Sequence, residues 1–117
     1  MDGLSTINKL ITEFENAHNS KGAISFFRKS PEAYLIFLTI MRSFYSNEPI
    51  TIEKLIHVVS PRYCSRQTVK NITNNALQAH IITKEIDQKD KRKKYFIPSE
   101  KTIKEFDIWI SKSLKDL

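Results

Sequence analysis

The stretch from Ser65 to Ala79, SRQTVKNITNNALQA, is the most informative part of this 117-residue chain. Ser65 is a favourable N-cap residue, and the apolar side chains after it recur at the spacing of a helix packed on a core: Val69, Ile72, Ala76 and Leu77. The other face is polar and contains no acidic residue: Arg66, Gln67, Lys70, Asn71, Asn74, Asn75 and Gln78. A solvated helix face is the alternative, but such faces usually carry glutamate. The composition therefore favours a helix that faces phosphates.

The segments on either side of this helix predict the fold class. Thr51 is a capping residue for a short helix over 52–59, which Ser60-Pro61 ends because the residue before proline avoids the helical region. After the helix, residues 81–86 and 94–97 have the pattern of two strands joined by a charged loop. Two short helices with a tight connection, followed by a hairpin, are typical of a winged helix-turn-helix.

The remaining segments complete a mainly α protein with a small β-hairpin wing (α+β). Ser30-Pro31-Glu32 begins a helix over 31–45 that is apolar nearly all round and is expected to be the buried centre. We expect one domain over 1–117, with a DNA-binding core at 31–97. An N-terminal helix and connection (1–29) and a C-terminal helix (99–117) flank that core. In the connection, 19–29, three apolar side chains must be buried: Ile24, Phe26 and Phe27.

Positive charge is concentrated in the central third of the chain. Between Ser60 and Lys94 there are nine basic residues and three acidic ones, and the whole chain, with 19 basic and 13 acidic residues, has the same net charge of +6. The rest of the chain is therefore neutral overall. Such a concentration suits a surface that follows phosphates, with an anionic membrane surface as the second choice.

Residue types on the predicted second helix match the chemistry of base edges. Arg and Lys pair with guanine O6 and N7, and Asn and Gln pair with adenine N6 and N7, so the base-contacting candidates are Arg66, Gln67, Lys70 and Asn71. Ser65 and Thr68 are better placed for phosphate at the helix N-terminus. Arg62 in the turn is a further backbone candidate, and Asn74 is expected at the edge of the groove.

The hairpin loop, 87–93, is the second candidate contact surface. A long arginine at its tip, Arg92, is suited to a narrow minor groove, and Asp90 is placed to hold its guanidinium through a bidentate pair. Other basic residues of this region are candidates for backbone contacts: Lys84, Lys89, Lys91 and Lys93. The alternative is an exposed turn that happens to be charged.

Several of these motifs together resemble the MarR family of bacterial transcription regulators. The resemblance covers 31–101 and rests on Ser65 to Asn71, on Ile81-Ile82-Thr83-Lys84, on Asp87 to Arg92 and on Tyr95 to Lys101. It implies that Asp90 and Arg92 match the family's wing aspartate and minor-groove arginine. The chain departs from the family at Ala79-His80, where a Lys-Gly turn is usual, and at Thr102, where glycine is usual. It is also shorter than most members.

The terminal helices carry apolar stripes that we expect to form a dimer interface, as the resemblance implies. The candidate interface residues are Leu4, Ile7, Ile11, Phe14, Phe106, Trp109, Ile110 and Leu114. The alternative is that both stripes cover the core of a monomer. Cys64, before a helix N-terminus and between Arg62 and Arg66, is expected to have a lowered thiol pKa, and a redox switch is one hypothesis for it, with inert packing as the other.

These features predict a sequence-specific, double-stranded DNA-binding transcriptional regulator that acts as a homodimer. The alternatives are a winged-helix assembly module that docks an acidic partner, and a non-specific or RNA-directed binder. No pattern indicates a catalytic site, a cofactor or a metal site, and no residue identifies a small-molecule effector. The single cysteine and the absence of a signal-peptide pattern favour the cytoplasm, and no segment is apolar enough to indicate a membrane span.

Overall fold

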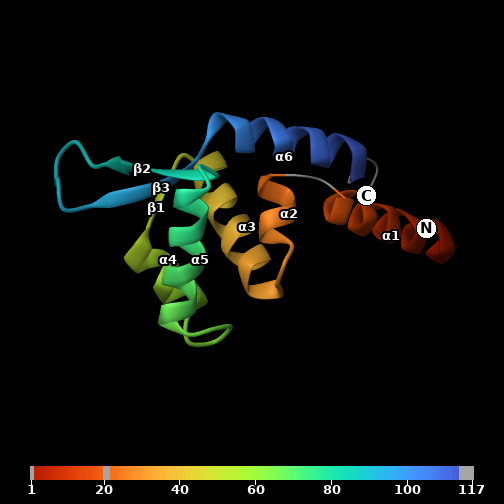
Figure 1. Cartoon of the computed structure of the whole chain (residues 1–117), viewed down its shortest axis with the longest axis horizontal. Helices are drawn as coiled ribbons and strands as arrows, with labels where there is room; N and C mark the ends of the chain where they lie inside the picture. The colour runs from red at the N-terminus through yellow and green to blue at the C-terminus, as the bar shows by residue number, and fades with distance from the viewer. Residues whose placement is uncertain (1, 20–21, 114–117) are drawn as a thin grey trace.

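The computed structural model describes residues 2–19 and 22–113 and has the predicted class of fold (Figure 1). It is mainly helical, with a three-stranded antiparallel sheet in the order β1-β3-β2. The elements in chain order are α1 (Gly3–Asn19), α2 (Ala23–Phe27), α3 (Pro31–Tyr45), β1 (Ile50–Thr51), α4 (Ile52–Val59), α5 (Arg66–Gln78), β2 (Ile82–Ile86), β3 (Lys94–Pro98) and α6 (Glu100–Ser113). Helices α4 and α5 with the β2–β3 hairpin confirm the winged helix-turn-helix.

Helix α3 is the centre of the core, as its sequence predicts. The Ser30 side chain accepts a hydrogen bond from the Ala33 N–H at 3.1 Å, and Pro31 takes the first helical position. Phe37 stacks on Phe27 with ring centroids 4.6 Å apart and meets Phe106 edge-on at 5.7 Å. The core thus joins α2, α3 and α6, and removing these aromatic surfaces from water is its main source of stability.

Helix α2 was predicted as part of a connection, and this prediction was wrong. The five-residue helix begins after Gly22, and the Ala23 N–H donates to Glu105 Oε2 on α6 at 2.8 Å. Gly22 has a φ of 94°, and a Cβ there would lie 2.5 Å from the Glu105 carboxylate. The cap therefore comes from a residue 82 positions away, which local pattern does not reveal. Ile24 and Phe27 are buried, as expected, and Phe26 is half-buried.

The helices that precede β1 and β2 end in the same way. Asn47 after α3 and His80 after α5 have positive φ values of 59° and 58°. The Ile81 N–H donates to the Ala76 carbonyl at 3.0 Å after α5, and the Glu48 N–H donates to the Ser43 carbonyl at 3.0 Å after α3. These are Schellman ends, in which glycine is the usual left-handed residue. At the departure noted at Ala79-His80, His80 therefore adopts the left-handed backbone conformation that glycine usually occupies at a helix end.

Thr102, the other departure from the family pattern, connects α6 to the wing. Its side chain is buried, and its hydroxyl donates to the Ile81 carbonyl at 2.7 Å. Ser99 accepts from the Thr102 N–H at 3.2 Å and so caps the helix. A glycine at 102 would lose the hydroxyl bond.

Helix α1 lies against α2 and α6 and extends away from the wing (Figure 1). Its contact with the rest of the chain includes Glu13, which is buried and forms an ion pair with Arg28. The Arg28 guanidinium also lies over the Tyr34 ring, 4.5 Å from its centroid. Within the described ranges, no helix has the length and apolar character that a membrane span needs.

Candidate nucleic-acid interface

Helix α5 presents the polar face that its sequence predicts. The Ser65 hydroxyl accepts from the Thr68 N–H at 3.1 Å, which satisfies one of the free donors at the helix start. Val69 and Ala76 are buried, whereas Ile72 and Leu77 are half-buried. Thr73 is also buried, and its hydroxyl donates to the Val69 carbonyl at 2.9 Å. Sequence reasoning missed Thr73 because an internal hydroxyl bond makes a polar residue compatible with a core.

The base-contacting candidates lie on the exposed side of α5. Four of the candidates on this helix are exposed: Arg66, Gln67, Asn71 and Asn74. Lys70 and Thr68 are both half-buried. The Gln67 amide nitrogen donates to Asn71 Oδ1 at 2.9 Å, so these two amides lie side by side one turn apart. The Gln67 carbonyl oxygen and the Asn71 amide nitrogen stay without a hydrogen-bond partner among the described residues.

Arg66 has a partner that the sequence pattern did not reveal. Its Nη2 lies 3.2 Å from Oε2 and 3.4 Å from Oε1 of Glu53, in the first turn of α4. The two helices of the helix-turn-helix are thus joined at their N-terminal ends by an exposed ion pair. The two residues are 13 positions apart in the sequence, and their contact depends on how α4 crosses α5, which local patterns do not specify.

The wing tip is organised by two aspartates. Asp90 Oδ1 accepts from both the Arg92 N–H, at 3.0 Å, and the Arg92 Nε, at 3.3 Å. A single carboxylate oxygen therefore holds Arg92, in place of the two-oxygen fork that was expected. Asp87 accepts from the Lys89 N–H at 2.8 Å and from the Tyr95 hydroxyl at 2.7 Å. The Tyr95 hydrogen bond is the main cause that lowers the pKa of Asp87, and the same bond raises the pKa of Tyr95.

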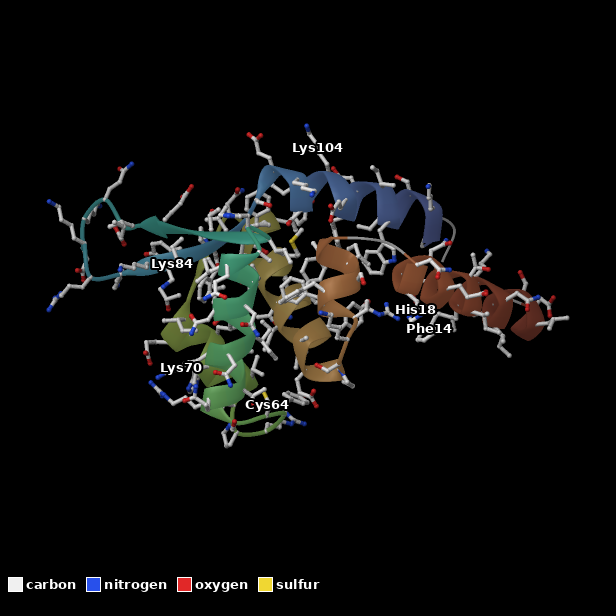
Figure 2. The ribbon with its side chains drawn as sticks, viewed as in Figure 1. Phe14, His18, Cys64, Lys70, Lys84 and Lys104 are labelled. Atoms are coloured by element: carbon white, nitrogen blue, oxygen red, sulfur yellow. The ribbon has the colours of Figure 1, made fainter. Side chains whose placement is uncertain are left out.

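The other basic candidates of the wing are exposed. Arg92 keeps 93% of its side-chain surface in solvent, and Lys84, Lys89, Lys91 and Lys93 are also exposed. Lys84 on β2 and Lys70 on α5 lie on the wing side of the molecule, far from Phe14 and His18 on α1 (Figure 2). Arg62, in the α4–α5 connection, is exposed over the Tyr63 ring at 5.3 Å from its centroid. The basic candidates of α5 and the wing thus belong to one end of the fold.

The expected low pKa of Cys64 was wrong. Burial raises the pKa of the Cys64 thiol, and the negative charge of Glu32 raises it further. The neighbouring arginines do not offset this, since Arg62 lies over Tyr63 and Arg66 pairs with Glu53. Cys64 packs against the core as a half-buried side chain, which favours inert packing over redox sensing.

The candidate dimer residues divide into two groups. On α1, Leu4, Ile7, Ile11 and Phe14 keep between 52% and 66% of their surface exposed, and Leu10 joins them at 49%. On α6, Ile110 is exposed, whereas Phe106 is half-buried and Trp109 is buried against Phe106 and Tyr34 of its own chain. Trp109 thus differs from the expectation, because it faces the core. Leu114 lies outside the described residues.

No metal-binding cluster accompanies these surfaces in the part of the chain that the structure describes. Among the residues that the structure describes, there is no group of three or more His, Cys, Asp or Glu side chains that could hold a metal ion. What the geometry offers is a polar helix face and a basic hairpin at one end, and an exposed apolar helix face at the other.

The comparisons with known proteins bear on the fold. No protein-family model and no curated protein sequence matches the chain. Its structural neighbours are MarR-family winged-helix transcriptional regulators over nearly the whole chain. A MarR-like regulator from Thermotoga maritima is similar at 18% identity and a TM-score of 0.58, over 98% of this chain and 79% of that one. Staphylococcus aureus MepR in a DNA complex is similar at 16% identity and a TM-score of 0.61, over 92% and 77%. Reduced AbfR bound to DNA is similar at 16% identity and a TM-score of 0.57, over 97% of this chain and 76% of that one.

Proposed function

We propose that this chain is a sequence-specific, dimeric transcriptional regulator that binds double-stranded DNA. Its fold is that of MarR-type DNA-binding transcriptional regulators, which are not enzymes. In this proposal α5 lies in the major groove and the wing enters the minor groove. The observation that carries it is the acid-free polar face of α5, exposed at the same end of the fold as the basic wing.

The contacts divide by chemistry. Arg66, Gln67 and Asn71, at the N-terminal end of α5, are proposed to read base edges, since that end of a recognition helix reaches deepest into the groove. Ser65, Thr68 and Arg62 are proposed to hold phosphates, together with the exposed lysines of the wing. Arg92, held extended by Asp90, is proposed to enter the minor groove, where the negative potential is strongest.

The homodimer is proposed from the apolar face of α1. One winged helix contacts too few bases for useful specificity, so two copies are needed. The exposed side chains of α1 lie at the end of the molecule opposite the wing, where a two-fold pairing would leave both α5 helices free (Figure 1). Two of the proteins with a similar fold, MepR and AbfR, have been solved with DNA, which supports the proposal.

Selection of bound duplexes from a random-sequence pool at physiological salt tests the proposal directly. We expect enrichment of an inverted repeat whose half-sites are about one helical turn apart. Enrichment of a single half-site would contradict the dimer but keep the base contacts. Recovery of DNA without enrichment would contradict sequence specificity and favour a non-specific binder, and the absence of any DNA would favour a module that docks an acidic protein.

A further inference from the structure

The ion pair between Glu53 and Arg66 places a carboxylate on a surface that is otherwise suited to phosphates. Glu53 is the second residue of α4, and Arg66 is the first residue of α5. Both are well exposed, with 70% and 56% of their side-chain surface in solvent. An acidic group here lowers the affinity for any DNA, because it repels the phosphates that the neighbouring lysines attract.

Fold stability does not account for this pair, and helix electrostatics favours only its acidic member. Exposed ion pairs contribute little to stability, since water screens the charges and two long side chains must be ordered. Arg66 is also at the positive end of the α5 dipole, where a cation is disfavoured, whereas Glu53 is well placed at the start of α4. The carboxylate therefore acts mainly on the arginine, offsetting the dipole and limiting its rotamers.

The geometry of the pair leaves the arginine able to bind a base. Nη2 is the guanidinium nitrogen that contacts both oxygens of Glu53. Within the described part of the chain, Nη1 and Nε of Arg66 have no hydrogen-bond partner. A guanidinium has five N–H donors in a fixed fork, so free donors remain for guanine O6 and N7. An arginine that is already restrained loses less conformational freedom when it binds.

We propose that Glu53 is a positioning residue for base recognition, which holds Arg66 extended toward guanine and lowers the affinity for DNA in general. This inference rests on the proposed function, because it requires that α5 lies in the major groove. It gives the helix-turn-helix a source of specificity on α4, outside the recognition helix. Affinity and specificity should therefore respond in opposite directions to the loss of this carboxylate.

The variant Glu53→Gln tests the inference, with Arg66→Ala and the double variant beside it. Affinities are measured by fluorescence anisotropy for the selected operator, for operators changed at each half-site position, and for a random duplex. In Glu53→Gln, we expect the preference for guanine at one position to fall about threefold, while binding to the random duplex becomes about threefold tighter. In the Arg66→Ala background, Glu53→Gln should leave the remaining base preference unchanged.

Glu85→Gln is the matched control, since Glu85 is an exposed carboxylate on β2 of the wing. It should tighten binding to all duplexes alike and leave the guanine preference intact, and both variants should keep the wild-type melting temperature. An unchanged guanine preference in Glu53→Gln would overturn the inference while leaving the proposed function intact. A change of base preference that persists without Arg66 would also overturn it, since Glu53 would then contact a base itself. A wild-type protein that selects no site would overturn both proposals.

Discussion

Helices α1 and α5 are both amphipathic, but α5 buries its apolar face against the core, whereas α1 leaves its apolar face exposed. Helix α5 buries Val69 and Ala76 and exposes its amides and arginine, as a surface helix of a globular protein does. Helix α1 buries Glu13 and Ala17 and exposes a continuous apolar face: Leu4, Ile7, Leu10, Ile11 and Phe14. A single copy of the chain therefore covers the apolar face of α5 but leaves the apolar face of α1 in water.

This difference identifies two surfaces with different chemistry. The exposed apolar face supports the proposed contact between two copies, whereas the polar, acid-free face beside a basic hairpin supports the proposed contact with DNA. Because Phe14 on α1 and Lys70 on α5 lie on opposite sides of α2 and α3, both surfaces are accessible at once (Figure 2). Variants on the two helices should then affect separate properties, which the following experiments examine.

The largest effect is expected where α1 is attached to its own chain. Arg28→Ala leaves Glu13 buried without its partner and removes the contact with the Tyr34 ring, so the free energy of unfolding should fall by about 3 kcal/mol. Urea denaturation of the full chain measures this. Lys29→Ala is the control, since Lys29 is exposed and contacts only the Phe26 ring among the described interactions. Equal losses in both variants would contradict a stabilising role for the buried pair.

The exposed face of α1 gives the next largest effect. Ile11→Asp places a charge in the proposed interface of both copies, and we expect the dimer dissociation constant to rise about 100-fold, or about 2.7 kcal/mol. Sedimentation equilibrium measures the constant. Thr12→Asp, one residue along on the exposed side of α1, adds the same charge outside the apolar face and should leave the constant unchanged. A wild-type chain that is monomeric at all concentrations would remove α1 as the interface.

Local signals were sufficient for the elements that the chain specifies by itself. The bounds of α3 follow from Ser30-Pro31 at its start, and α5 follows from the Ser65 cap and its apolar spacing. Helix α2 could not be predicted in this way, because five residues show no period and Glu105 supplies the cap from α6. The buried position of Trp109 was missed for a related reason, since one apolar stripe does not tell which part of it meets the core.

The candidate site shows the same limit. Residue types and charge were visible in the sequence, and the structure exposes them together at one end of the fold. The contacts that modify them were not visible: Glu53 on Arg66, Tyr95 on Asp87 and Glu32 near Cys64. Each joins separate elements, so it depends on tertiary packing. The direction of the Cys64 pKa shift was mispredicted for this reason, because burial and Glu32 raise this pKa while Arg62 and Arg66 contact other groups.

On α5, a smaller and more selective effect is expected. Asn71→Ala should lower the preference for adenine at one half-site position about tenfold, or about 1.4 kcal/mol, without changing the dimer dissociation constant. Lys93→Ala should weaken binding to all sequences alike and reduce the salt dependence by about one phosphate contact. Anisotropy titrations over a range of salt concentrations separate the two. If Asn71→Ala weakened all sequences equally, α5 would not read bases at that residue.

The smallest effect is expected at the junction between α5 and the wing. His80 has a φ of 58°, a conformation that costs a residue with a side chain about 1 kcal/mol, so His80→Gly should raise the free energy of unfolding by about that amount. Asn47→Gly, at the matching position after α3, is the control and should gain less, since asparagine tolerates this conformation better. Both are measured by urea denaturation. Because the Ile81 N–H already fixes the helix end on Ala76, neither change should alter dimerisation through α1. A shift of the dimer dissociation constant in His80→Gly would show that the two ends of the molecule are coupled, against the independence that the opposite faces of α1 and α5 imply.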